Sequence, residues 1–214
     1  MRIKLLIYIY IMEYNKLIGW HDYASHNTTT NNIQLSDSYT RIFDHVLKKH
    51  EPRIILELNV DTGKNTQWFA DYTNDNTHIY AADMWERNKI TFFDNLCSKK
   101  NKITPMQMNA LTSADFLLHH NIIPNFIFIS HARAEDIRKL LLKFPNAIIA
   151  GDNYNREIRE VAVEHKKSLH VDTNNVWIYD QVQNKYGEQI LIGTNATIAD
   201  DRSLLRAFLN EISI

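Results

Sequence analysis

The 214-residue chain has little of several features that would point directly to a function. Cys97 is its single cysteine, so the chain cannot form an intramolecular disulfide or a cysteine-rich zinc site. Lys and Arg number 24 against 25 Asp and Glu, which gives a formal net charge of −1 and no general basic field for a polyanion. These absences favour a protein of the reducing cytoplasm and disfavour nucleic acid as its main partner.

The apolar run at the N-terminus is too short to span a membrane. Residues 1–12 place two positive charges before it, but no small-residue cleavage site follows, and a membrane helix needs roughly 20 apolar residues. We therefore expect no membrane partner, and we interpret residues 1–12 as a β-prone segment or as sequence upstream of a start at Met12. Residues 24–35 are too polar to pack, which predicts a loop or lid. Residues 1–35 would then form an N-terminal extension and residues 36–214 one domain.

From residue 36 onward, short apolar runs alternate with amphipathic stretches, although the chain has only 5 Gly and 4 Pro to mark the turns. This alternation is typical of a parallel, doubly wound sheet. The expected strands are 54–58, 78–82, 103–108, 125–129, 147–150, 176–179 and 189–192. The expected helices are 36–50, 66–72, 87–98, 113–119, 135–144 and 156–167. The last two strands are joined by a short polar segment, which predicts a hairpin. The fold class is therefore α/β: a Rossmann-like three-layer α/β/α sandwich with a seven-stranded, mainly parallel sheet and an antiparallel edge strand.

The most informative segment is the first strand and the loop that follows it. Residues 54–66 read as an apolar strand, a loop and the start of a helix, and residues 79–83 return as a second strand that ends in a carboxylate. This is the outline of a nucleotide-binding βαβ unit. In such a unit the loop turns tightly under an adenosine-type ligand, and Asp83 is placed to accept hydrogen bonds from both ribose hydroxyls.

Three segments together resemble the class I S-adenosylmethionine (SAM)-dependent methyltransferases. Glu57, Asn59 and Gly63 form E-x-N-x-x-x-G, which resembles the first motif of that family, usually written E/D-x-G-x-G or E-x-G-x-x-x-G. Residues 147–155, with the helix and the Trp-containing strand that follow, resemble its strand-five segment. Residues 38–43 resemble an H-x-Y-T-x-x-Y element of related sugar O-methyltransferases. The resemblance covers about residues 36 to 180 and implies SAM as the cofactor.

In open α/β sheets, ligands bind beyond the carboxyl ends of the strands, so the candidate cofactor residues are those at the strand ends. In the context of the resemblance, these residues are Glu57, Asn59, Gly63, Asp83, Trp85, Asn109 and Ser130.

The resemblance also implies a metal and a base. Asp152 and Asn153 fall where catechol-type and sugar O-methyltransferases place the oxygen ligands of Mg²⁺, which would lower the pKa of a bound substrate hydroxyl. The family commonly ends its fourth strand with Asp, whereas this chain has Ser130 there, so one metal carboxylate is missing. His131 is the candidate for a metal-independent general base, with Asp152 as its partner.

Two functions are therefore open. The first is SAM-dependent O-methylation of a small-molecule or sugar hydroxyl. The second is a catalytically inactive binding or scaffold protein on the same fold, because the loop lacks a glycine and the fourth strand lacks its Asp.

Overall fold

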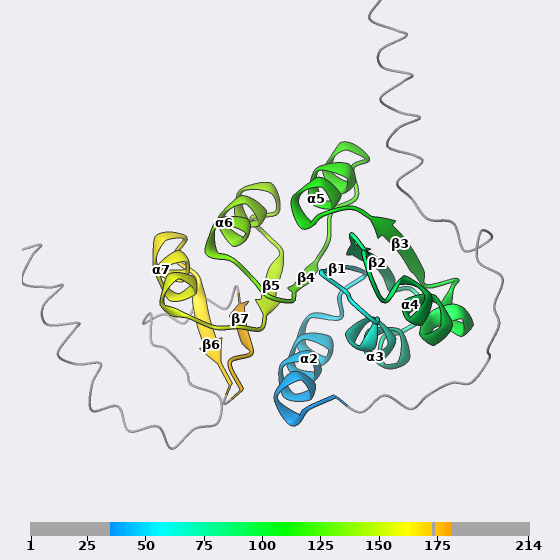
Figure 1. Cartoon of the computed structure of the whole chain (residues 1–214). Helices are drawn as coiled ribbons and strands as arrows, with labels where there is room; N and C mark the ends of the chain where they lie inside the picture. The colour runs from blue at the N-terminus through cyan, green and yellow to red at the C-terminus, as the bar shows by residue number, and fades with distance from the viewer. Residues whose placement is uncertain (1–34, 173, 181–214) are drawn as a thin grey trace, which may run out of the picture.

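The computed structural model describes residues 35–172 and 174–180, which fold into three layers (Figure 1). The sheet consists of β1 (Ile54–Leu58), β2 (His78–Asp83), β3 (Ile103–Gln107), β4 (Phe126–Ile129), β5 (Ile148–Gly151), β6 (Ser168–Val171) and β7 (Trp177–Asp180). The helices are α2 (Asp37–His50), α3 (Lys64–Tyr72), α4 (Lys89–Leu96) with the 3₁₀ turn η2 (Cys97–Lys99), α5 (Ala110–His119), α6 (Ala134–Lys143) and α7 (Arg156–Glu164).

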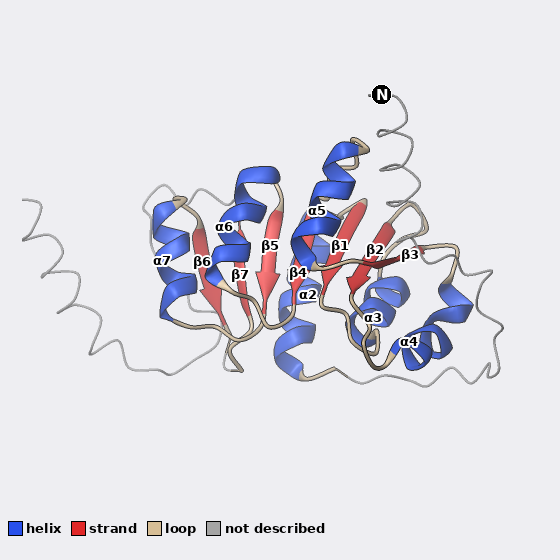
Figure 2. Cartoon of the chain, turned by 45° about the horizontal axis from the view of Figure 1, so that its top comes forward, coloured by secondary structure: helices blue, strands red, loops and turns tan. Residues whose placement is uncertain are grey.

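The seven strands lie in the order β3-β2-β1-β4-β5-β7-β6. β1 pairs in parallel with β2 and β4, and β7 is antiparallel to both β5 and β6. The predicted fold class, a mainly parallel seven-stranded sheet with antiparallel pairing at one edge, is confirmed. Because the parallel strands run the same way, the loops that follow them meet at one edge of the sheet (Figure 2).

The structure describes a hairpin that the sequence patterns did not predict. The hairpin joins β6 to β7, and the sequence patterns missed β6 because only Leu169 of its four residues is buried. The expected strand at 189–192 lies outside the described residues, as does nearly all of the N-terminal extension 1–35.

Alternating side chains of the strands build two cores. Leu56 and Leu58 of β1 face the helices α5, α6 and α7. Ile55 lies on the opposite face, where the fully buried Phe43 of α2 is surrounded by aromatic rings of α3 and β4, including that of Phe128 at a ring distance of 5.0 Å. Burial on both faces favours apolar residues throughout a strand, which explains the unbroken run at 54–56, and the buried Glu57 is the exception in β1.

Helix α2 is held to the β6–β7 turn by a charged contact. Arg41 donates two hydrogen bonds to the buried carboxylate of Asp172, at 2.8 Å from Nε and 2.7 Å from Nη2. The hydroxyl of Ser38 donates to the same carboxylate at 3.2 Å. Hydrogen bonding to Asp172 raises the pKa of Arg41, so the guanidinium stays charged. The contact fixes α2 beside the edge of the sheet where the parallel strands end.

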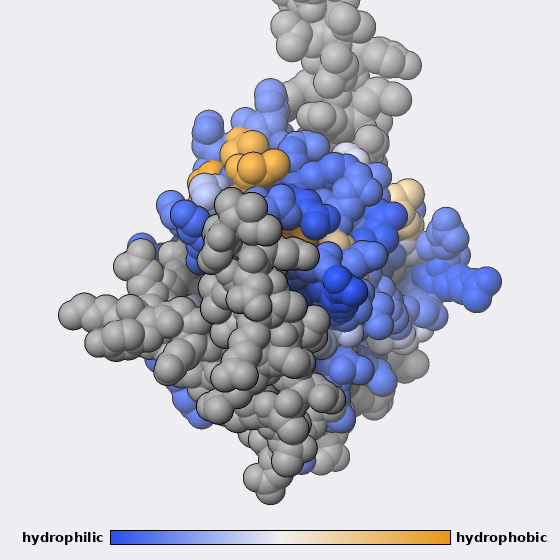
Figure 3. Space-filling model, turned by 90° about the vertical axis from the view of Figure 1, so that its left-hand side faces the viewer, coloured by the Kyte–Doolittle hydropathy of each residue, from blue (hydrophilic) through white to orange (hydrophobic). Residues whose placement is uncertain are grey.

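The described surface that is visible on the side of α7 and β6 is mainly hydrophilic, with small, separate hydrophobic areas (Figure 3). This agrees with helices α6 and α7 turning their apolar residues, such as Ile137 and Ile158, into the core. Within residues 35–172 and 174–180, no helix is both long and apolar enough to cross a membrane.

Candidate functional site

The loop between β1 and α3 has three residues with left-handed backbone angles. Asn59, Asp61 and Gly63 have φ values of 59°, 55° and 80°. Asn and Asp tolerate this conformation better than other non-glycine residues, so they can stand where glycine is the ordinary choice. At Gly63 the positive φ and the packing both favour glycine, because a Cβ would lie 2.7 Å from Cδ1 of Leu96 and 2.9 Å from Cδ2 of Phe92, and these side chains would have to shift. The left-handed angles thus alternate along the loop, and the N–H of Gly63 donates to the backbone oxygen of Val60 at 3.1 Å to close a turn.

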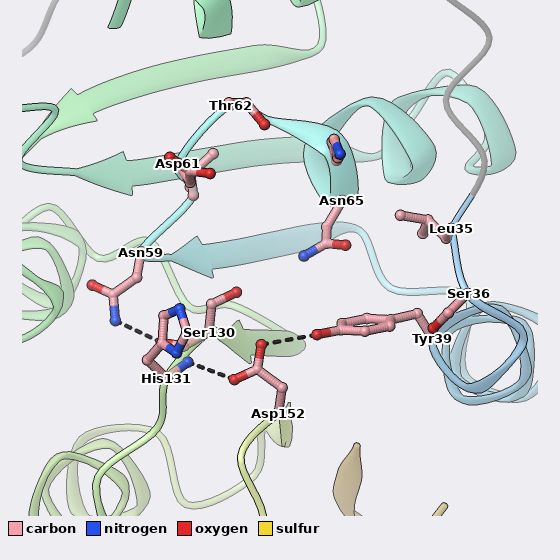
Figure 4. Close-up of a pocket in the computed structure, with 12 residues that line it drawn as sticks. Leu35, Ser36, Tyr39, Asn59, Asp61, Thr62, Asn65, Ser130, His131 and Asp152 are labelled. Atoms are coloured by element: carbon pink, nitrogen blue, oxygen red, sulfur yellow. Dashed lines mark hydrogen bonds between the residues drawn. The ribbon is translucent and has the colours of Figure 1, made fainter. Parts of the chain in front are cut away.

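A cavity of about 350 Å³ opens on one side of this loop (Figure 4). Residues of α2, the β1–α3 loop, α3, the end of β4 and the end of β5 converge on it. Its lining residues are Leu35, Ser36, Tyr39, Asn59, Val60, Asp61, Thr62, Lys64, Asn65, Ser130, His131 and Asp152.

Asp152 is the polar centre of this cavity. Its Oδ1 accepts the backbone N–H of His131 at 2.6 Å, and its Oδ2 accepts the hydroxyl of Tyr39 at 2.9 Å (Figure 4). Burial, with the neighbouring Asp152 charge, raises the pKa of Tyr39 well above its ordinary value, so the phenol stays protonated and acts as a donor. Behind the carboxylate, the indole N–H of Trp177 donates to the backbone oxygen of Asp152 at 3.0 Å.

His131 lies at the end of β4 with its backbone in the left-handed region, at φ 54°. Its contact with Asp152 is made by the backbone N–H of His131, so the predicted partnership of Asp152 with the imidazole stays a prediction. The exposed side chain lines the cavity, where it can accept a proton from a bound hydroxyl. Beside it, the backbone oxygen of Ser130 accepts a hydrogen bond from Nδ2 of Asn59 at 2.7 Å, which ties the ends of β1 and β4 together.

A second cavity of about 310 Å³ lies on the other side of the loop, against the end of β2. Asp83 lines it and holds the loop in place: Oδ2 accepts the N–H of Asp61 at 2.9 Å, and Oδ1 accepts the N–H of Trp85 at 2.7 Å. Each carboxylate oxygen retains a second acceptor position, so Asp83 can still bind ligand hydroxyls. Trp85 is buried against Phe92 and forms part of the wall.

Glu57 is fully buried under the first turn of α3. The hydroxyl of Thr66 donates to its Oε2 at 2.5 Å, whereas Oε1 has no hydrogen-bond partner among the described residues. Burial raises the pKa of Glu57 to about 8, so the carboxyl is mostly neutral at physiological pH. Glu57 therefore supports the loop from behind and lines neither cavity.

Three other predicted residues, Gly63, Asn109 and Asn153, line neither cavity. Asn109 is the N-cap of α5, where its side-chain oxygen accepts the N–H of Thr112 at 2.9 Å. Asn153 is exposed, has a left-handed backbone at φ 62°, and lines neither cavity.

The donor set does not fit Mg²⁺. Asn153 does not line the cavity that contains Asp152, so the two predicted oxygen ligands do not line a common cavity. Within the part of the chain that the structure describes, no three His, Cys, Asp or Glu side chains are grouped as metal ligands. The expected metal thus finds no support here, in agreement with the missing carboxylate at Ser130.

The sequence patterns overlooked Asp61, Lys64 and the role of Tyr39 in the site. The place of Asp61 in the loop could have been recognised from the sequence. Asn, Asp and Gly are the residue types most tolerant of left-handed backbone angles, and they stand at the alternate positions 59, 61 and 63. No sequence pattern indicates the role of Tyr39, because it contacts Asp152 only through the packing of α2 against the sheet edge.

No protein-family model matches the chain, and no curated protein sequence matches it. Solved structures do resemble it. A methyltransferase from Geobacter sulfurreducens superimposes with a TM-score of 0.57 at 12% identity, covering 68% of this chain and 78% of its own. The O-methyltransferase TomG from Streptomyces achromogenes, solved in complex with SAM, gives a TM-score of 0.52 at 14% identity, covering 69% and 80%.

An O-methyltransferase from Bacillus cereus, solved in complex with SAH, gives a TM-score of 0.51 at 14% identity and covers 71% of this chain and 84% of its own. At such low identities the likeness concerns architecture, and it agrees with the strand order and the single antiparallel strand described above. The chain has the fold of the class I SAM-dependent methyltransferases.

Proposed function

We propose that the protein is a SAM-dependent methyltransferase that methylates a hydroxyl group of a small molecule or sugar. The observation that carries the proposal is the pair of cavities on either side of the β1–α3 loop, at the edge where ligands bind in open α/β sheets. One cavity contains Asp83, and the other contains His131 with Asp152. This division separates a place for the cofactor's adenosine from a place for chemistry.

The residues present suit SAM in two respects. Asp83 offers free acceptor positions for the ribose hydroxyls in the second cavity. Lys64 lies at the N-terminus of α3 and lines the first cavity, where a cation and a helix dipole favour the carboxylate of an amino-acid moiety. SAM would supply an electrophilic methyl group at this edge of the sheet.

The side chains around the first cavity provide positioning and a proton acceptor. Asp152 holds the turn at His131 by accepting its backbone N–H, and Tyr39 fixes the orientation of that carboxylate. The imidazole of His131 accepts the proton of the acceptor hydroxyl and, being exposed, can release it to solvent. Alignment of the acceptor hydroxyl with the methyl group supplies much of the remaining rate enhancement. No step requires a metal ligand from Asp152.

A second function is favoured by one observation. Asn59 and Asp61 carry side chains at positions where glycine would let a ligand approach the backbone, as expected of a fold kept for binding or scaffolding without catalysis. We further infer that residues 36–214 act as one domain, in the cytoplasm, with a small-molecule partner.

Thermal unfolding with and without SAM tests the proposal. SAM at about 100 times its Kd should stabilise the protein by roughly 2.7 kcal/mol, and methyl transfer should appear in a screen of hydroxylated acceptors. His131→Ala should abolish transfer while keeping the SAM-dependent shift, and Arg156→Ala, on an exposed face of α7, is the control. A shift without turnover in any acceptor would favour the scaffold function; no shift would refute the SAM site.

A further inference from the structure

Asp61 occupies a special place between the two cavities. Of the described residues that line them, Asp61 alone lines both. It stands on the β1–α3 loop above the ends of the strands (Figure 4). A ligand that extends from one cavity into the other must therefore pass beside Asp61.

The structure holds Asp61 firmly in that place. Its N–H donates to Asp83 at 2.9 Å, and its backbone oxygen accepts the indole N–H of Trp85 at 3.0 Å. Its carboxylate accepts a hydrogen bond from the side-chain amide of Asn88. The left-handed φ of 55° thus belongs to a residue tied down at three points. The carboxylate cannot easily swing away from a ligand that bridges the cavities.

The charge of this carboxylate distinguishes the two forms of the cofactor. The methyl donor SAM carries a positive sulfonium between its amino-acid and adenosine moieties, whereas the demethylated product, S-adenosylhomocysteine, has a neutral thioether there. Lys64 in the first cavity suits the amino-acid carboxylate, and Asp83 in the second suits the ribose. Asp61 lies between them, where the sulfonium falls in a ligand that bridges both.

We propose that Asp61 is a specificity residue that makes this site bind the charged methyl donor in preference to its neutral product. The inference rests on the proposed function and assigns a role to the side chain that replaces glycine in the loop. A glycine there could not discriminate by charge. The carboxylate therefore weakens product inhibition without contacting the methyl acceptor.

Calorimetric titration of SAM and of S-adenosylhomocysteine into the full-length protein tests the inference without any turnover. The wild type should bind SAM more tightly. Asp61→Asn keeps the size and the tolerance of left-handed angles but removes the charge, so the preference for SAM should fall by about fivefold, the range of an exposed charge pair. Asp61→Glu should restore much of it. Asp71→Asn, an exposed carboxylate of α3 paired with Lys99, is the control and should leave the preference unchanged.

A second measurement needs no variant. Raising the salt from 0.05 to about 1 M shortens the Debye length to about 3 Å and should reduce the wild-type preference for SAM in the same direction as Asp61→Asn. If both ligands bind and neither salt nor Asp61→Asn changes their ratio, the role of Asp61 is refuted while the proposed function stands. If neither ligand binds the wild type, the proposed function fails and this inference fails with it.

Discussion

Glu57 is the residue whose ionisation depends most on its surroundings. Burial raises its pKa from 4.5 to about 8, so between these pH values the folded protein holds a proton that the unfolded chain releases. The stability that comes from this proton is fully present below about pH 4.5 and is lost as the pH rises through 8, at up to about 1.4 kcal/mol per pH unit.

Glu57→Gln should therefore change how stability depends on pH. The amide keeps an acceptor for Thr66 and does not ionise, so relative to the wild type the variant should gain stability steadily from pH 5 to 8. Urea unfolding at several pH values measures this difference. Glu86→Gln, on an exposed side chain, is the control. A constant difference between Glu57→Gln and the wild type over this range would contradict a neutral buried carboxyl.

Asp83 is the residue on which cofactor affinity should depend most. Asp83→Ala removes the proposed acceptors for two ribose hydroxyls and also releases the N–H of Asp61, so SAM should bind at least about tenfold more weakly, a loss of about 1.4 kcal/mol or more. Calorimetry measures the affinity, and circular dichroism checks that the variant is folded. Unchanged affinity in a folded variant would place the ligand elsewhere.

At the scale of elements, α2 is attached to the rest of the fold by its charged contact as well as by its apolar face. Asp172→Ala removes the carboxylate that Arg41 and Ser38 share, and should lower the melting temperature because a donor network loses its acceptor. Limited proteolysis should then cut first near α2. The control is Glu160→Ala, which breaks only an exposed ion pair within α7 and should change neither the melting temperature nor the site of proteolysis. Equal effects from both variants would mean that the contact of Arg41 and Ser38 with Asp172 does not stabilise α2.

The elements that could be predicted from the sequence are those with a strong local pattern. β4 is a continuous apolar run, β1 is apolar except for Glu57, and α2 shows helical spacing up to Pro52, so the local sequence pattern specifies these elements. β6 has no such pattern. Its pairing depends on β7, which is an interaction distant in sequence.

The same distinction holds for the candidate site. Asp83 and His131 follow strand ends, which sequence spacing locates well. The engagement of Asp152 by Tyr39 could not be anticipated, because 113 residues separate the two and only the docking of α2 brings them together. The role of Asn109 as a helix cap was equally open, since a polar residue after a strand can either bind ligand or begin the next helix.

For the whole molecule, the position of a strand in the sheet should set how slowly its amides exchange with solvent. β1 and β4 have hydrogen-bonded neighbours on both sides and are buried on both faces, whereas β3 and β6 lie at the ends of the described sheet. Hydrogen exchange should be slower in β1 and β4 by on the order of a hundredfold. Equal protection of β6 and β1 would show that the sheet opens as one unit.

The reversed direction of β7 has an optical consequence. Because β7 runs against its neighbours, its first residue, Trp177, lies at the ligand-binding edge, with its indole hydrogen-bonded behind Asp152. Trp85 stands in the wall of the other cavity. The molecule thus has an intrinsic fluorophore beside each half of the candidate site, and comparing the emission of Trp85→Phe and Trp177→Phe with that of the wild type would assign a ligand-induced change to one half without any attached dye.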